Sequence, residues 1–193
     1  MTQSMEWGDP VRGATPGRRQ PSVRRSAAEL FAAEPELILA YLEGSGEEYP
    51  WNAQRVLASA LDALALRSGY ADLHYCAAHA ALAAEQPALA LELLHTALRI
   101  NPSYDAALIL AARIREKQGK HEEATRHLEE VLAHGADYPD VHLMLGDLWQ
   151  TRSDLPRARA AYRRALQLNS NFTAAAERLA RVGAAGGTNG LPA

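Results

Sequence analysis

The sequence of 193 residues has one cysteine, two phenylalanines and few of the β-branched residues that favour strands. A single cysteine, Cys76, excludes an internal disulfide. No apolar run approaches the ~20 residues that a membrane span needs, and the N-terminus has no apolar stretch of the kind found in secretory signals. Alanine and leucine, which favour helices, dominate what remains. We therefore expect a mainly helical, cytoplasmic protein.

A strong excess of charge of either sign is also missing, because the formal net charge is −3. This balance gives no indication of a nucleic-acid or membrane partner. Residues 1–25 are locally basic, with five arginines against Glu6 and Asp9. A basic arm can bind nucleic acid through phosphates, but no aromatic residues for base stacking lie between these arginines. We interpret residues 1–25 as a disordered, solvated arm and disfavour nucleic acid as a partner.

A regular period is the main positive feature of the sequence. The segment "ALRINPSY" at 97–104 has one counterpart at 131–138, "VLAHGADY", and another at 165–172, "ALQLNSNF". An earlier counterpart, "ALALRSGY", occupies 63–70. Successive segments of the four are therefore separated by the same number of residues. Within each unit, small and large apolar residues follow at i, i+4 and i+7, which is one face of a helix. These positions are Ala90, Leu94 and Ala97, then Ala124, Leu128 and Val131, then Ala158, Tyr162 and Ala165.

Each unit is predicted to contain two helices joined by a tight turn. In the last unit, Gly146 and Trp149 lie on an apolar stripe that "TRSD" interrupts. Asp154 then suits an N-cap and Pro156 suits the first turn of the second helix. Two helices of this length cannot bury their apolar faces alone, so successive units must stack on one another.

These residues resemble the tetratricopeptide repeat, whose pattern over about 34 residues is Trp-x2-Leu-Gly-x2-Tyr, then Ala-x3-Phe, then Pro. The last unit matches at Leu145, Gly146, Ala158 and Tyr162, with Trp149 in place of Tyr, His142 in place of Trp and Ser170 in place of Pro. The earlier units keep Gly119 at the interhelix turn and Pro102 after the second helix. The resemblance implies an all-α fold, a right-handed α-solenoid of antiparallel helix pairs.

The period also predicts the organisation of the chain. Three units are expected at 71–104, 105–138 and 139–172. Residues 26–70 are expected to form a degenerate unit, with a capping box at Ser26 and Glu29, a break at Pro35 and a loop at 44–51. A capping helix is expected at 173–183, stopped by Gly183, and a flexible tail at 184–193. The aromatic that closes each unit, such as Tyr70 or Tyr138, is expected to fill the corner before the next.

No pattern in the sequence indicates an enzyme, a metal or a cofactor. The segment "HEEATRH" at 121–127 places His121 and His127 six residues apart, whereas a zinc-protease helix needs them four apart on one face. His74 and His142 occupy the same position of two units and are interpreted as packing residues. Cys76 has no nucleophile context and is expected to pack as a small apolar group.

In the family that the sequence resembles, the first helix of each unit lines a concave surface that binds peptides or partner helices. Carrying that register over gives nine candidate binding residues, Asp72, Tyr75, His79, Ile109, Arg113, Glu116, Leu143, Asp147 and Gln150. The Lys and Asn residues with which chaperone adaptors of the family clamp a carboxylate are missing here. The leading hypothesis is a non-enzymatic adaptor or assembly scaffold that binds a protein or peptide. The alternatives are a self-assembling scaffold, hence a homo-oligomer, and a nucleic-acid accessory protein that uses the arginine arm.

Overall fold

The computed structural model describes residues 26–43 and 53–185, and all regular structure within them is helical. The predicted arm at 1–25 and the predicted loop at 44–51 lie outside the described residues, and so does the predicted tail at 184–193 apart from 184 and 185. The first helices, α1 (Ala27–Ala33), α2 (Glu36–Glu43) and α3 (Ala53–Leu66), precede the regular part of the chain. The remaining helices are α4 (Ala71–Ala83), α5 (Pro87–Ile100), α6 (Asp105–Lys117), α7 (His121–Ala133), α8 (Pro139–Thr151), α9 (Leu155–Leu168) and α10 (Thr173–Ala185).

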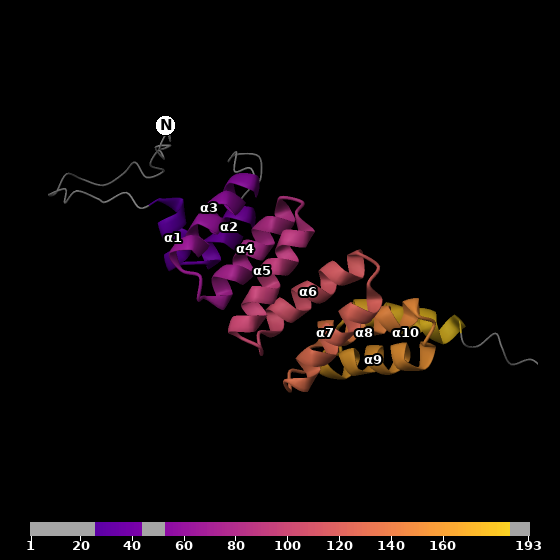
Figure 1. Cartoon of the computed structure of the whole chain (residues 1–193). Helices are drawn as coiled ribbons and strands as arrows, with labels where there is room; N and C mark the ends of the chain where they lie inside the picture. Colours follow the sequence, from indigo (N-terminus) through magenta and orange to yellow (C-terminus); the bar gives the residue numbers. More distant parts are fainter. Residues whose placement is uncertain (1–25, 44–52, 186–193) are drawn as a thin grey trace, which may run out of the picture.

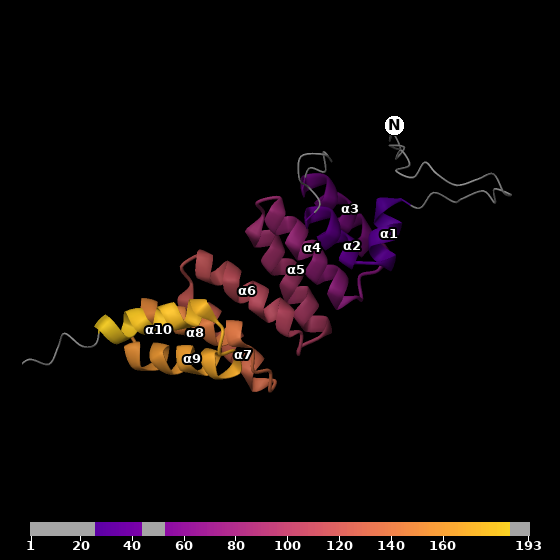
Figure 2. The same ribbon diagram turned by 180° about the vertical axis from the view of Figure 1, so that it is seen from behind.

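The helices stack in chain order as an elongated solenoid, which confirms the predicted fold class (Figure 1). The main pairs are α4 with α5, α6 with α7 and α8 with α9. From behind, α10 is seen to lie along the last pair (Figure 2). Each pair hides its apolar faces only by leaning on the next, as expected for stacked repeats.

The periodic positions lie in the core, as the sequence predicts. Ala90, Ala124 and Ala158 are 0% exposed, and so are Leu94, Leu128 and Tyr162 four residues on. Small residues at these places allow close approach of neighbouring helix axes, and the larger residues fill the space beside them.

The clearest close approach is at Gly146, in the middle of α8. A Cβ atom at this position would overlap the ring of Tyr162 on α9, so the Gly146 backbone lies directly against that ring. The glycine therefore permits a fully buried tyrosine in this helix pair.

Three equivalent turns join the helices within the pairs. Glu85, Gly119 and Ser153 occupy the same position of the three units, and their φ angles are 59°, 73° and 61°. This left-handed conformation is favourable for glycine and costs other residues about 1–2 kcal/mol. The turn geometry is thus repeated even where the glycine is absent, and only Gly119 marks it in the sequence.

Several local predictions are confirmed. Ser26 and Glu29 form the capping box at the start of α1, and Asp154 accepts a hydrogen bond from the backbone N–H of Arg157 at the start of α9. The chain breaks between α1 and α2 at Glu34 and Pro35.

Two predictions differ from the structure. Gly183 does not stop α10, which continues to Ala185. Gly183 is not among the described glycines with a positive φ, and glycine ends a helix when it takes that conformation. The corner aromatics are also unequal, because Tyr70 is 53% and Tyr138 is 45% exposed. Tyr104, by contrast, is half-buried against Tyr75, with ring centroids 5.2 Å apart. The position alone therefore does not bury the ring.

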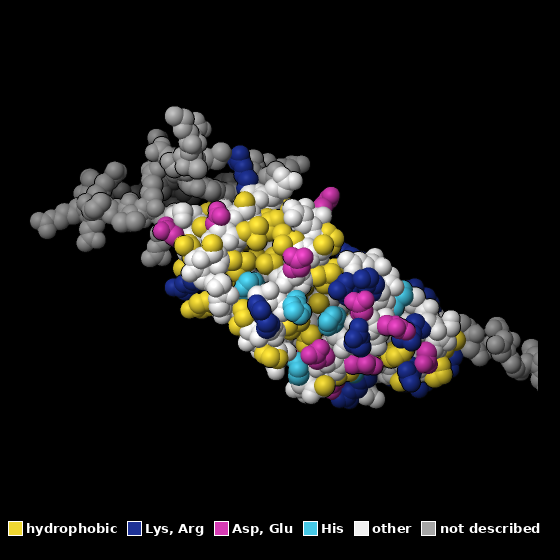
Figure 3. All heavy atoms as spheres, in the orientation of Figure 1, with side chains coloured by type: hydrophobic (Ala, Val, Ile, Leu, Met, Phe, Trp, Pro, Cys, Tyr) yellow, Lys and Arg dark blue, Asp and Glu magenta, His cyan; other side chains and the backbone are white. Residues whose placement is uncertain are grey.

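The core is divided into clusters, with α6 between the first two. Leu110 and Ile114 belong to the cluster formed with α1–α5, whereas Leu108 and Ala112 belong to the cluster formed with α7–α9. On the face seen in Figure 3, hydrophobic side chains gather over the helices before α6, and most charged side chains lie from α6 onward.

Candidate functional site

A groove lies where α4, α6 and α8 come together, and we call it the central groove. Its volume is about 1040 Å³, which is at the upper end of the range for small-molecule pockets. Its apolar lining comes from Leu82, Pro87, Leu110, Ile114, Leu143, Met144 and Phe172. Its charged lining comes from Arg113, Glu116, Lys117 and Asp140. A surface of this kind can hold several side chains of a larger partner.

Of the nine sequence-predicted residues, Arg113, Glu116 and Leu143 line the central groove. Arg113 and Glu116 come from the second half of α6, and Leu143 comes from the first half of α8. Burial raises the pKa of Glu116, and the charge of Asp147 raises it further. The Glu116 carboxylate is therefore partly shielded from water and lies close enough to Asp147 to be affected by its negative charge.

The candidates on α4 form an aromatic cluster that does not line the groove. The ring of Tyr75 lies edge-on to His79, with centroids 4.8 Å apart, and also contacts Tyr104. Burial and then the neighbouring Asp72 raise the pKa of Tyr104, while burial and then the charge of Arg113 lower the pKa of His79. These side chains hold one another in place beside Arg113.

The side chain of Ile109 packs against the core and does not line the groove. It is half-buried against the cluster that contains Leu108 and Val141. The three apolar candidates, Tyr75, Ile109 and Leu143, therefore do not share one groove, because Leu143 is the one of the three that lines it.

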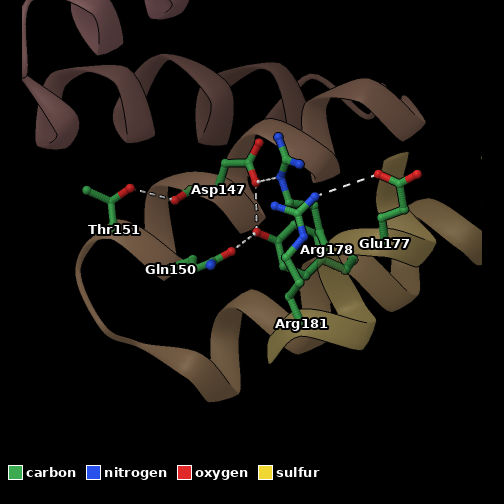
Figure 4. A network of polar contacts seen from close by, with 7 residues as sticks. Asp147, Gln150, Thr151, Glu177, Arg178 and Arg181 are labelled. Atoms are coloured by element: carbon green, nitrogen blue, oxygen red, sulfur yellow. Dashed lines mark hydrogen bonds and ion pairs between the residues drawn. The ribbon is translucent and has the colours of Figure 1, made fainter. Parts of the chain in front are cut away.

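The candidates Asp147 and Gln150 belong to a polar network with α9 and α10 (Figure 4). The Tyr162 hydroxyl lies 2.8 Å from Asp147 Oδ1 and 2.8 Å from Gln150 Oε1. Arg178 Nε of α10 donates to Asp147 Oδ1 at 2.7 Å. Burial, then the hydrogen bond and charge of Asp147, raises the pKa of Tyr162. These two candidates are thus occupied by the protein itself.

The sequence reasoning missed much of the apolar lining. Leu110, Ile114 and Met144 lie one residue beyond the chosen register positions 109, 113 and 143, and a wider stripe on each helix would have included them. Leu82 and Pro87 flank the turn between α4 and α5, where the helical period gives no signal. Phe172 was identified only as the closing aromatic of its unit.

The histidines and the cysteine have structural surroundings. His74 is 7% exposed and its Nε2 lies 2.9 Å from the Ser68 carbonyl oxygen, whereas His142 Nε2 lies 2.6 Å from Asp137 Oδ1. Cys76 is buried, which raises the pKa of its thiol to about 12. Over 26–43 and 53–185, no three His, Cys, Asp or Glu residues are grouped as metal ligands would be. None of the helices described is both long and apolar enough to span a bilayer.

One family model matches part of the chain. Residues 81–148 match the family model for the tetratricopeptide repeat. No curated protein sequence matches the chain.

Solved structures show the same fold. PilF of Pseudomonas aeruginosa is 23% identical over 81% of this chain and 67% of its own, with a TM-score of 0.67. A MamA RS-1 double mutant is 15% identical over 85% of this chain and 87% of its own, with a TM-score of 0.70. YrrB, described as a TPR protein with an unusual peptide-binding site, is 23% identical over 66% of each chain, with a TM-score of 0.60. Residues 81–148 thus match the tetratricopeptide repeat, and the described chain has the all-α solenoid fold of the structures to which it is similar.

Proposed function

We propose that the protein is a non-enzymatic adaptor or assembly scaffold that binds a peptide or helix of a partner protein in the central groove. The observation that carries this proposal is the groove itself, with an apolar floor drawn from several helices and a charged rim. Exposed apolar surface rimmed by charge is typical of protein interaction sites. The peptide-binding site named for YrrB shows that one protein of this fold binds peptides.

The proposal keeps three of the predicted residues in the groove and changes the role of the others. Arg113, Glu116 and Leu143 would contact the partner. The Tyr75 cluster and the Asp147 network would hold the groove walls from either end.

A peptide-display library selected against the full chain tests the proposal. Selected peptides are then titrated by calorimetry against wild type and Leu143→Ser. We expect Leu143→Ser to weaken binding about tenfold or more, equivalent to about 1.4 kcal/mol, because it removes apolar floor. Arg126→Glu, an exposed change on α7, is the matched control and should leave affinity unchanged.

Circular dichroism melting of both variants checks that they are folded; Met144→Ser replaces Leu143→Ser if the latter melts early. Selected peptides that bind both groove variants as well as wild type would refute this site. Light scattering across concentration separates the alternative: a mass that rises in wild type and not in Leu143→Ser would assign the groove to a second copy of the chain.

A further inference from the structure

The backbone of any occupant limits what the central groove can hold. The groove walls are helices, whose backbone N–H and C=O groups bond within each helix. Among the described side chains that line the groove, Gln118 is the one amide. An extended peptide would therefore lay many unpaired N–H and C=O groups on Leu110, Ile114, Leu143 and Met144, and each such group is costly to bury.

A helical occupant avoids this cost, because its backbone groups are already paired. With side chains, a helix is about 10–12 Å across, and it offers an apolar stripe at i, i+3, i+4 and i+7. That stripe matches a floor assembled from α4, α6 and α8. The groove thus suits helix-in-groove recognition.

The charges on the groove rim further restrict the occupant. Within the described part of the chain, no ion pair joins Arg113, Glu116, Lys117 or Asp140 to any residue. Acids and bases next to the groove are paired: Arg115 on the same helix as Arg113 bonds Glu123 at 3.0 Å, and Asp147 bonds Arg178.

The four free charges are two cations and two anions, so neither sign dominates the rim. Arg113 and Lys117 are four residues apart on α6, on one face of the helix. Glu116 lies between them in sequence, is half-buried and forms no ion pair in the described residues, so a cation of the occupant can pair with it. An occupant with charges of one sign would meet like charges at two positions.

We propose that the occupant is an amphipathic α-helix of a partner protein, whose apolar stripe is flanked by both acidic and basic residues. This inference rests on the proposed function. The acidic residues of the helix face Arg113 and Lys117, and its basic residues face Glu116 and Asp140.

Four labelled peptides with one leucine stripe test the inference by fluorescence anisotropy against the full chain. Their flanks are mixed Glu and Lys, all Glu, all Lys, and mixed with one central proline that breaks the helix. Wild type should bind the mixed peptide about tenfold more tightly than the other three. The double variant Arg113→Glu with Lys117→Glu makes the rim acidic and should prefer the all-Lys peptide. The control double variant Arg99→Glu with Arg126→Glu, on α5 and α7, should keep the preference for the mixed peptide.

Failure of the inference and failure of the proposed function give different results. Equal binding of the proline peptide would overturn the helical occupant, and equal binding of the three flank types would overturn the charge selection. If none of the four binds while display-selected peptides bind in a Leu143-dependent way, the adaptor stands and this inference falls. If no selected peptide depends on Leu143, the proposed function falls with it.

Discussion

Arg113 on α6 and Asp147 on α8 occupy the same position of consecutive repeats, yet they have opposite roles. Arg113 lines the central groove without an ion pair in the described residues. Asp147 is held by Tyr162 and by Arg178 of α10. Glu116 and Gln150 differ in the same way. The register of a repeat therefore gives the direction of a side chain, while the next element in the stack decides whether that side chain is available to a partner.

The largest expected loss of stability comes from a substitution in the Asp147 network, where the side chains are bonded to one another. Tyr162→Ala removes a side chain that is 0% exposed and both hydrogen bonds of its hydroxyl. By analogy with other large aromatics truncated in cores, the loss of stability should be about 3–5 kcal/mol. Urea unfolding followed by circular dichroism measures it. Tyr104→Ala, at a half-buried ring beside the groove, should cost clearly less; equal losses would contradict the contrast.

A paired substitution sharpens the comparison at the shared repeat position. Asp147→Ala leaves Tyr162 and Arg178 without their common acceptor and should cost about 1–2 kcal/mol. Arg113→Ala removes an exposed side chain that forms no ion pair in the described residues, and it should change stability by no more than about 0.5 kcal/mol. Thermal melts of the two variants side by side suffice. A larger loss for Arg113→Ala would show that this arginine is structural and would remove it from the groove rim.

The smallest effect is a difference in alkaline stability. The folded-state pKa of Tyr162 is raised, so the stability it contributes is full below the ordinary pKa of about 10 and declines as pH rises above it. Tyr162→Phe should therefore lose less stability than wild type between pH 8 and pH 10.5, after its constant loss of the hydroxyl bonds is subtracted. The pKa of Tyr75, in the cluster on α4, is also raised. The pH dependence of Tyr75→Phe therefore serves as the comparison for that of Tyr162→Phe. Parallel pH curves for wild type and Tyr162→Phe would contradict the assignment.

The fold could be predicted from the sequence because the apolar residues that bury each helix recur at a constant interval. Ala124, Leu128 and Val131 recur in type and spacing in the other units, and periodic burial of this kind leaves few alternatives to stacked helix pairs. The sequence indicated one of the three turns within the pairs, through Gly119. The other two adopt the same left-handed conformation at Glu85 and Ser153, which are not glycines.

The binding residues were harder to predict, because their availability depends on contacts that are not periodic. Nothing in the spacing of Asp147 shows that Arg178, on the helix after the last pair, will bond to it. Likewise, nothing in the spacing of Tyr75 shows that Tyr104 and His79 will pack against it. Arg113, Glu116 and Leu143 line the groove, although Leu143 also packs against the cluster that contains Tyr162 and Val182.

The position of α6 has a mechanical consequence. Its Leu110 side packs with α1–α5 and its Leu108 side packs with α7–α9. Helix α6 therefore belongs to the cores of two blocks, one formed with the helices before it and one formed with the helices after it. A rotation of one block relative to the other would move Leu82 of α4 relative to Leu143 of α8, and both of these residues line the groove. A molecule bound between these two residues would therefore favour one relative orientation of the two blocks.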